Sequence, residues 1–324
     1  MTKSQKSDPV GDKTGGPVIV GRSQAMRRVY RQIDQVAALP VTVLITGESG
    51  TGKELVAWRI HRKSRRSDGP FIPVNMGAVA RDLVESELFG HEKGAFTGAA
   101  YQHKGKFETA SGGTLFLDEI STMTEKLQVS LLRVLETMEF QRVGGQRSRK
   151  ADLRLLAATN GDLRKDIEER RFREDLYHRL NVFNIHIPPL RERGDDIVLL
   201  AEHFLERYAD ELESPAESLS SEVLALLKGY SWPGNVRELE NTMIRAVVMT
   251  RDPTVTPEAL PDALRGEAED SETITLSVGQ TLDEAEREII ARTLDAVRGN
   301  KSKAASILGL SRKAIYNKLR HLTL

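Results

Sequence analysis

The sequence of 324 residues contains no cysteine. This absence excludes a disulfide framework and a metal site built on thiolates, and it fits a reducing cytoplasm. No run of about 18 apolar residues occurs, so we expect no membrane-spanning segment and a cytoplasmic location. Residues 1–17 lack the apolar core of a signal peptide, and their polar composition predicts a disordered tail.

The chain also has no net charge, because 47 basic residues balance 47 acidic ones. Affinity for nucleic acid or for a membrane would therefore have to come from a local concentration of charge. The length allows two or three domains, each with a hydrophobic core of its own.

Hydrophobic patterning divides the chain into an α/β part and a helical part. Between residues 18 and 190, short candidates for buried strands such as Val41–Thr46 and Thr114–Leu117 alternate with amphipathic stretches. Strands that alternate with helices predict a parallel sheet with flanking helices. The remaining predicted segments are a helical part at 191–264, a linker at 265–280 and a final helical unit at 281–324.

One glycine-rich segment, Gly47–Lys53, has the pattern of a phosphate-binding loop. It matches the first seven positions of G-x-x-x-x-G-K-[ST] and lies between a predicted strand and a predicted helix. Loop N–H groups and the helix N-terminus would surround the phosphates of ATP, and Lys53 would reach the β- and γ-phosphates. The alternative is a glycine-rich turn that binds nothing. The predicted nucleotide contacts are Gly47, Glu48, Ser49, Gly50, Thr51, Gly52, Lys53 and Glu54.

Polar pairs at the ends of two predicted buried strands complete this site. Asp118 would bind Mg²⁺, directly or through water, and Glu119 would polarise the attacking water. Asn160 would sense the γ-phosphate. Position 54 is Glu, so the usual Ser or Thr ligand of magnesium is missing. The alternatives are two solvated acids at one strand end and a capping asparagine at the other.

A short loop between the two nucleotide-binding elements has the sequence Gly94-Ala95-Phe96-Thr97-Gly98-Ala99. Its two glycines allow backbone angles that other residues avoid, so the loop can bend sharply at both ends. If it projects, its phenylalanine is exposed, which marks a contact site, and its threonine offers a hydroxyl to a partner. This position suggests that hydrolysis moves the loop. The alternative is a buried turn with the phenylalanine in the core.

Taken together, these segments resemble the AAA+ ATPases and, more narrowly, the sigma-54-dependent transcription activators. The resemblance covers residues 18–263 and implies an AAA+ α/β ATPase core at 18–190 and a helical lid at 191–264. The family commonly has an acidic residue at the position of Glu54. The matching segments are Gly47–Glu54, Glu87–Ala99, Gly112–Glu119, Phe172–Leu180, Pro188–Arg193 and Trp232–Asn241.

The resemblance also implies roles for further residues. Asn75 would hold the catalytic glutamate inactive until the nucleotide state changes, and Arg237 of the lid would contact the nucleotide. Arg173 and Arg179 would reach into the ATP site of a neighbouring subunit, so we expect a homo-oligomer, a hexamer built from dimers. The alternative for the arginines is a set of structural ion pairs. The loop at residues 94–99 would contact sigma-54, with Glu92 pairing with a base that the sequence does not identify.

The C-terminal segment 301–320 resembles a helix-turn-helix of the factor-for-inversion-stimulation type. Seven basic and no acidic residues occur from Arg298 onward, Gly309 would make the turn, and Ser311 would cap the second helix. The alternative is a basic helical hairpin that contacts protein. The predicted DNA contacts are Lys301, Lys303, Ser311, Arg312, Lys313, Tyr316, Asn317, Lys318 and Arg320.

The sequence thus predicts an ATP-hydrolysing activator that binds enhancer DNA and remodels sigma-54 RNA polymerase. Because residues 1–17 are too few for a sensing domain, we expect a regulator protein in trans, control by expression level, or truncation of a longer chain. Two rival interpretations are a DNA-binding regulator with a vestigial ATPase and an AAA+ remodeller of an unrelated client.

Overall fold

The computed structural model describes residues 18–80, 83–265, 281–297, 300–311, 314–315 and 318. The predicted tail at 1–17 and residues 266–280 of the predicted linker lie outside this range. The chain divides into two compact units, Met1–Pro261 and Asp262–Leu324, and each is described here by itself. The predicted DNA contacts that also lie outside the described residues are Arg312, Lys313, Tyr316, Asn317 and Arg320.

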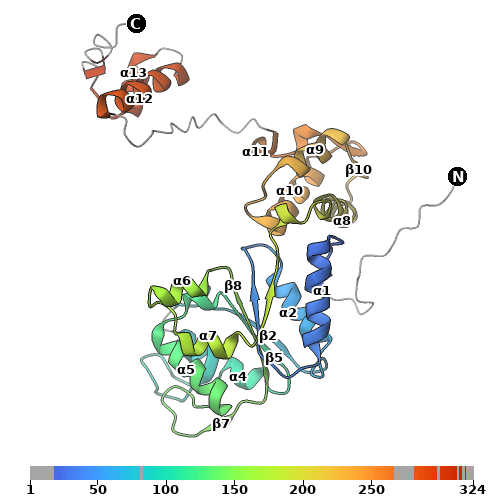
Figure 1. Cartoon of the computed structure of the whole chain (residues 1–324), viewed down its shortest axis with the longest axis vertical. Helices are drawn as coiled ribbons and strands as arrows, with labels where there is room; N and C mark the ends of the chain where they lie inside the picture. Colours follow the sequence, from blue (N-terminus) through green and yellow to red (C-terminus); the bar gives the residue numbers. More distant parts are fainter. Residues whose placement is uncertain are drawn as a thin grey trace, which may run out of the picture. The chain divides into compact units, whose positions relative to one another are not determined.

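A five-stranded parallel sheet forms the centre of the first unit (Figure 1). The strand order is β2-β5-β8-β1-β9, so the carboxyl ends of all five strands meet at one edge. Residues of β8 are buried throughout, as expected for a strand covered on both faces. The strands are β1 (Val43–Thr46), β2 (Phe71–Asn75), β5 (Thr114–Asp118), β8 (Arg154–Thr159) and β9 (Phe183–His186).

Helices cover both faces of this sheet (Figure 1). On one face, α1 (Gln24–Ala37) and α2 (Lys53–Arg62) bury Ile33 and Ile60 in one apolar cluster. On the other face, residues such as Leu131 belong to a second cluster. The helices around that second cluster are α3 (Val84–Phe89), α4 (Lys106–Thr109), α5 (Glu125–Thr137), α6 (Leu163–Glu168) and α7 (Glu174–Leu180). The predicted parallel α/β fold is confirmed.

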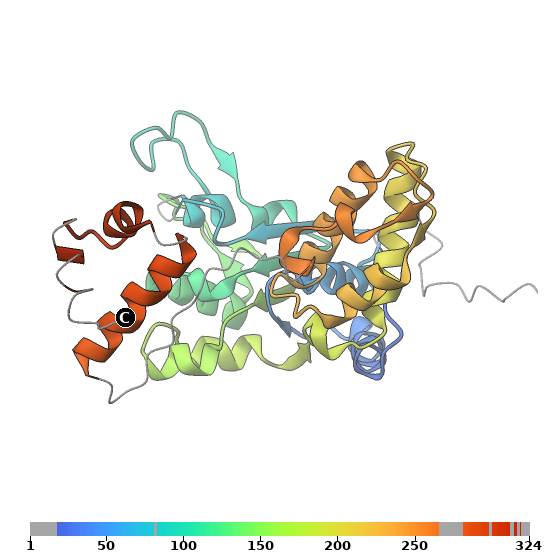
Figure 2. The ribbon, with the colours of Figure 1, turned by 90° about the horizontal axis from the view of Figure 1, so that it is seen from above.

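Two hairpins extend from the second face. One joins β3 (Gly90–His91) to β4 (His103–Lys104), and the other joins β6 (Glu139–Phe140) to β7 (Arg149–Lys150). In Figure 2 the first hairpin, in teal, stands clear of the neighbouring helices. The loop of residues 94–99 lies within it.

The rest of the first unit is helical. The lid consists chiefly of α8 (Asp196–Glu211), α9 (Ser221–Gly229) and α10 (Asn235–Met249). Trp232 is fully buried between them, and its indole N–H donates to the Leu227 carbonyl at 2.8 Å. Shorter elements are η1 (Ile120–Thr122), η2 (Leu190–Glu192), β10 (Ser218–Leu219), β11 (Thr254–Val255) and η3 (Pro257–Ala259).

The second unit contains α11 (Asp262–Arg265), α12 (Leu282–Ala296) and α13 (Lys301–Ile307). Ala304, with neighbouring apolar residues, forms a small core. Gly309 follows α13 with φ +64°, the left-handed conformation that a tight helix-turn-helix connection requires. Among the described residues of both units, no helix is both long and apolar enough to cross a membrane.

A buried arginine ties α1 to the sheet. Arg154 begins β8, and its guanidinium donates to the carbonyls of Ala37 at 2.5 Å and Val36 at 2.8 Å. These carbonyls lie at the C-terminus of α1, where backbone acceptors lack partners within the helix. Burial lowers the pKa of Arg154 to about 10, so the side chain stays charged at neutral pH.

Replacement of Arg154 by methionine should lower the free energy of unfolding by about 1–3 kcal/mol, because two buried carbonyls would lose their donor. The exposed Arg147 provides a matched control, since Arg147→Met removes the same charge from the surface. Urea denaturation followed by circular dichroism measures both variants. Equal stability of the two variants would contradict the assigned role.

Candidate nucleotide-binding site

The loop Gly47–Gly52 joins the end of β1 to the start of α2 at the carboxyl edge of the sheet. Gly50 and Gly52 have φ values of +77° and +96°. A Cβ atom at Gly50 would lie 2.2 Å from the carbonyl oxygen of Gly234 in the lid, so only glycine fits there. The loop therefore has both the conformation and the position that the sequence predicts for binding phosphate.

Lys53 lies at the N-terminus of α2 with its ammonium group folded into this loop. Its Nζ donates to the carbonyls of Gly47 at 2.9 Å and Glu48 at 3.1 Å. Burial lowers the pKa of Lys53, and the carboxylates of Asp118 and Glu119 oppose this shift. The structure thus brings the predicted phosphate-binding lysine into the electric field of the two predicted catalytic acids.

Asp118 is the last residue of β5, and Glu119 follows it. The neighbouring strand β2 ends at Asn75, which pairs in register with Asp118. Glu119 has a left-handed backbone with φ +58°, which is uncommon for a non-glycine residue and typical of functional sites. A Cβ atom at Gly77 would lie 2.3 Å from Glu119 Oε2 and 3.3 Å from Asn75 Oδ1. The carboxylate of Glu119, the predicted catalytic acid, therefore lies against the turn that follows β2.

Asn75 organises that turn. Its Oδ1 accepts hydrogen bonds from the N–H groups of Gly77 at 2.8 Å and Ala78 at 3.0 Å. Among the described residues we find no direct hydrogen bond between Asn75 and Glu119. The asparagine consequently positions the backbone on which the carboxylate rests.

A cavity of about 350 Å³ opens beside the loop at the ends of β1, β8 and β9. Asn160 lines it together with Gly47 and Glu48, and the Gly47 N–H donates to the Thr159 carbonyl at 3.3 Å. The predicted γ-phosphate sensor is therefore held next to the phosphate loop.

The lid contacts the loop through the N-terminus of α10. The Arg237 N–H donates to the Gly50 carbonyl, and its guanidinium donates to Ser49 Oγ, both at 3.3 Å. Arg193, which is buried between the core and the lid, donates to the carbonyls of Thr51 and Pro188 at 2.9–3.0 Å. Burial lowers the pKa of Arg193 to about 10. The structure places Arg237 against the phosphate loop, while its predicted contact with the nucleotide stays a prediction; Arg193 is a further link that the sequence analysis missed.

Glu48 is an acid inside a loop that is built for anions, and the lid neutralises it. Arg191 makes a bidentate pair with its carboxylate at 2.5 and 2.9 Å, and Asn235 Nδ2 donates to it at 3.0 Å. The hydrogen bonds from Arg191 and then Asn235 lower the pKa of Glu48 to about 2. This contribution to stability is complete above the ordinary pKa of 4.5 and is lost as the pH falls towards 2. Sequence reasoning missed both partners, although an acid among phosphate ligands requires a nearby base.

Of the two arginines predicted to act across a subunit boundary, Arg173 is the half-buried residue that precedes α7, and Arg179 lies on the exposed side of that helix. Arg173 pairs with Asp175 at 2.7 Å, and Arg179 lies 3.8 Å from Glu136. In the described part of the chain, neither arginine contacts the phosphate loop of its own subunit. Their role at a subunit boundary stays a prediction.

The tip of the loop at residues 94–99 is exposed, whereas Ala99 at its end is buried. Gly94 and Gly98 have φ values of +81° and +106°, and a Cβ atom at either would meet nothing within 4 Å. The Phe96 side chain is 38% exposed and rests edge-on against the ring of His91, with centroids 4.9 Å apart. The alternative of a buried turn with Phe96 in the core is wrong.

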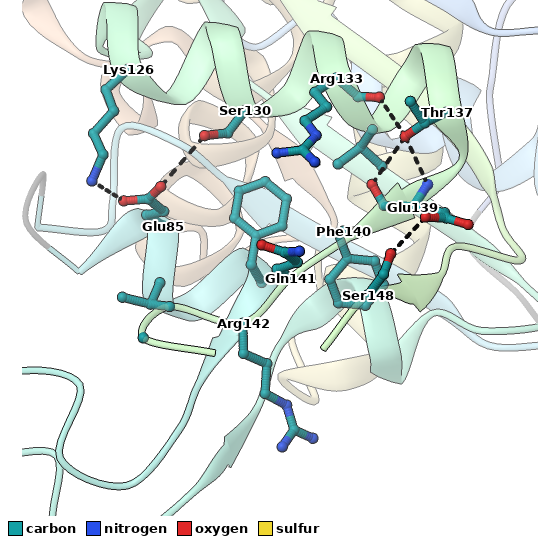
Figure 3. Close-up of a pocket in the computed structure, with 14 residues that line it drawn as sticks. Glu85, Lys126, Ser130, Arg133, Thr137, Glu139, Phe140, Gln141, Arg142 and Ser148 are labelled. Atoms are coloured by element: carbon teal, nitrogen blue, oxygen red, sulfur yellow. Dashed lines mark hydrogen bonds and ion pairs between the residues drawn. The ribbon is translucent and has the colours of Figure 1, made fainter. Parts of the chain in front are cut away.

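Glu92 pairs with Arg142 and, at 3.8 Å, with Arg149, neither of which the sequence analysis identified. Arg142 comes from the segment 139–148, which lines a cavity of about 340 Å³ with α3 and α5. Figure 3 shows its side chain pointing away from that cavity. Its guanidinium makes a bond of 3.1 Å to Glu92 and two bonds of 2.7 and 2.8 Å to Glu108. The pair is separated by 50 residues, and no sequence pattern connects them.

Part of the predicted DNA-binding surface of the helix-turn-helix unit lies within the described residues, namely Lys301, Lys303, Ser311 and Lys318. Ser311 Oγ accepts a hydrogen bond from the Ala314 N–H at 3.1 Å, which supports the predicted cap. Lys318 pairs with Glu286 of α12 at 2.6 Å. Lys301 and Lys303 lie on α13. The contacts of these residues with DNA stay predictions.

Three family models match consecutive parts of the chain. Residues 19–186 match the sigma-54 interaction domain, residues 191–276 match the AAA+ ATPase lid domain, and residues 281–322 match the bacterial regulatory protein, Fis family. The matched segments contain the phosphate loop, the lid contacts and the helix-turn-helix unit, respectively.

Similar proteins cover almost the whole chain. The DNA-binding transcriptional regulator NtrC of Rhizobium meliloti is 42% identical over 99% of this chain and 72% of its own length. Regulatory protein AtoC of Escherichia coli is 45% identical over 93% of this chain and 67% of its own length. The crystal structure of NtrX from Brucella abortus in complex with ATP is 36% identical, with a TM-score of 0.73, and covers 95% of this chain and 70% of that one. The chain belongs to the sigma-54-dependent transcription activators, with an AAA+ ATPase domain and a Fis-type DNA-binding helix-turn-helix domain.

Proposed function

We propose that this chain hydrolyses ATP at the boundary between two copies and uses the energy to move the loop at residues 94–99. The moving loop contacts sigma-54 and remodels the closed promoter complex, while the helix-turn-helix unit holds enhancer DNA. The observation that carries this proposal is the exposure of Phe96 on a glycine-hinged loop whose stem is held by ion pairs. A glycine-hinged segment with an exposed aromatic ring can bend and present that ring to a partner.

The residues at the end of β5 fit a magnesium–ATP complex. Asp118 offers a hard carboxylate oxygen near Lys53, the donor type that Mg²⁺ prefers beside phosphates. When bound, the ion neutralises charge on the phosphates. Lys53 binds the β- and γ-phosphates, Glu119 orients and polarises the attacking water, and Asn160 contacts the γ-phosphate.

A neighbouring subunit supplies the remaining charge. Arg173 and Arg179 present permanently charged, planar groups that suit the developing charge of phosphoryl transfer. In the single chain Arg173 makes a bidentate pair with Asp175, at 2.7 and 3.0 Å, which it would have to exchange for the neighbour's phosphate, whereas Arg179 lies 3.8 Å from Glu136. Hydrolysis then depends on assembly, and a closed ring, a hexamer by family resemblance, gives every site a donor.

The turn after β2 offers a route from chemistry to motion. Glu119 lies against Gly77, and the chain after this turn leads through α3 into β3 and the loop. If the Glu119 carboxylate moved when the γ-phosphate is lost, it would displace Gly77 and Asn75. That displacement would move the N-terminal end of α3. The ion pairs of Glu92 with Arg142 and Arg149 hold the other end of the hairpin stem.

The lid adjusts the charge of the phosphate loop. Without Arg191, the carboxylate of Glu48 would repel the triphosphate that the loop binds. The pair between Arg191 and Glu48 also holds the lid against the core. The charge of Glu48 is therefore neutralised only when the lid is in this position. Affinity for ATP therefore depends on the lid being in this position.

Removal of this positive charge by Arg191→Ala should weaken ATP binding roughly three- to tenfold, the scale of one unscreened charge near a phosphate. Adding Glu48→Gln to the same chain should restore part of the affinity, because the exposed negative charge disappears. Isothermal titration with a non-hydrolysable ATP analogue measures both effects. The exposed pair Arg207–Glu211 of α8 serves as the control, and no recovery in the double variant would contradict the charge argument.

Mixing two inactive variants tests whether active sites are shared. Lys53→Ala and Arg173→Ala should each abolish ATP turnover when pure. In an equal mixture, about one quarter of the boundaries pair an intact loop with an intact arginine, so activity should partly return. A mixture as inactive as its components would show that Arg173 acts within its own subunit or not at all.

The loop threonine tests coupling separately from hydrolysis. Thr97→Ala should retain ATP turnover but abolish formation of the open complex with sigma-54 RNA polymerase, because the loop would lose its hydroxyl contact. Thr254→Ala, at an exposed position of the lid, should retain both activities. Permanganate footprinting detects promoter melting, and normal melting with Thr97→Ala would remove this residue from the contact.

A further inference from the structure

A group of basic residues lies on the exposed side of α1, at the C-terminal end of α2 and in the segment that follows α2. The two helices pack side by side, since the Arg59 guanidinium lies 5.1 Å from the centroid of the Tyr30 ring and Lys63 pairs with Asp34 at 2.5 Å. We call this surface the arginine face and define it by Arg27, Arg28, Arg31, Arg62, Lys63, Arg65 and Arg66.

Core packing determines which way these side chains point. Helix α1 buries Met26, Val29 and Ile33 against the sheet, so the bases at positions 27, 28 and 31 lie on its exposed side. Helix α2 likewise buries Val56 and Ile60. The arginines are therefore not needed to fill the core, and the fold tolerates other polar residues at these positions.

The charge of the face is only partly compensated. Asp34 pairs with Lys63, and Asp152 pairs with Arg66 at 2.6 Å. Within the described range, Arg27, Arg28, Arg31 and Arg65 form no ion pair with a carboxylate. Because the whole chain is neutral, this uncompensated cluster is a local excess of positive charge rather than a property of the entire surface.

The type of base indicates the type of ligand. Six of the seven residues are arginine, whose planar fork binds phosphate oxygens in pairs. The Arg62 guanidinium lies 5.9 Å from the centroid of the Trp58 ring, an arrangement that steadies the side chain and leaves donors available. A surface built mainly of arginine therefore suits phosphate groups better than one built of lysine, whose ammonium group is more strongly hydrated.

The face is distinct from the ATP site. Lys53 begins α2 and Arg62 ends it, a separation of about 13 Å along the helix axis. The bases therefore lie too far along α2 to contact a triphosphate at its N-terminus. The fold thus places them on a separate surface, where they are available to an anion other than the nucleotide.

We infer that the arginine face binds the phosphate backbone of duplex DNA without reading its sequence. The inference rests on the DNA-binding role of the helix-turn-helix unit, which brings duplex DNA to the same molecule and raises its local concentration. Phosphate contacts of this kind add affinity and salt dependence rather than sequence preference. The ATPase domain then contributes to holding the DNA that the C-terminal unit selects.

The triple variant Arg27→Ala/Arg28→Ala/Arg31→Ala of the full chain tests this inference, because alanine preserves the helix. Fluorescence anisotropy with a random-sequence duplex, between about 50 and 200 mM salt, gives the slope of log affinity against log salt. The slope should become shallower by roughly 0.9 for each lost phosphate contact, thus by about two to three in total, and the affinity at about 0.1 M salt should fall at least tenfold.

The matched control is Lys228→Ala/Arg245→Ala/Arg251→Ala, which removes three exposed charges from the lid and should leave the slope unchanged. ATP turnover of both variants should equal that of the natural chain, which separates this test from the proposed motor function. An unchanged slope in the α1 variant would overturn the inference. A change of sedimentation in that variant with an unchanged slope would also overturn it, and would assign the face to contact between copies.

Discussion

A negative charge inside a loop that has to hold a triphosphate is the constraint around which the first unit is organised. Glu48 lies there because its carboxylate bonds the lid through Arg191 and Asn235. The buried Asn235 in turn accepts the Leu190 N–H at 2.8 Å, and the backbone of Gly50 closely approaches that of Gly234. Core and lid are thus joined at the point where the nucleotide binds, so nucleotide affinity and domain geometry cannot change independently.

Local features of this site follow from the sequence because their signals are contiguous. The β-branched run before Gly47 and the helical spacing after Lys53 predict a strand, a turn and a helix, and the structure contains all three. The flanking glycines alone leave both an exposed loop and a buried turn open for Phe96; the family resemblance favours exposure, and the side chain is exposed. The parallel sheet follows from the alternation of strands and helices.

The partners of buried arginines do not follow from the sequence. Arg142, Arg154 and Arg193 look like ordinary surface residues in a one-dimensional pattern, yet all three are buried. Their hydrogen-bond partners lie between 5 and 142 residues away for Arg193, and 117 or more residues away for Arg154. Such contacts depend on which elements the topology brings together, and that information is not local. In this chain without cysteine, the hydrogen bonds of these guanidinium groups connect segments that are distant in sequence, as disulfides do in other proteins.

Arg142 has a further consequence, because one guanidinium serves two carboxylates that come from opposite ends of the hairpin. Glu108 takes two of its hydrogen bonds and Glu92 takes one. If Glu92 moved away, the buried Arg142 would keep its two hydrogen bonds to Glu108 of α4, which Arg149 shares at 3.5 Å. The more exposed Arg149 would lose its contact of 3.8 Å with Glu92. The shared carboxylate of Glu108 would thus keep the deeply buried guanidinium paired, and the loss of charge compensation would fall on the arginine that solvent can reach.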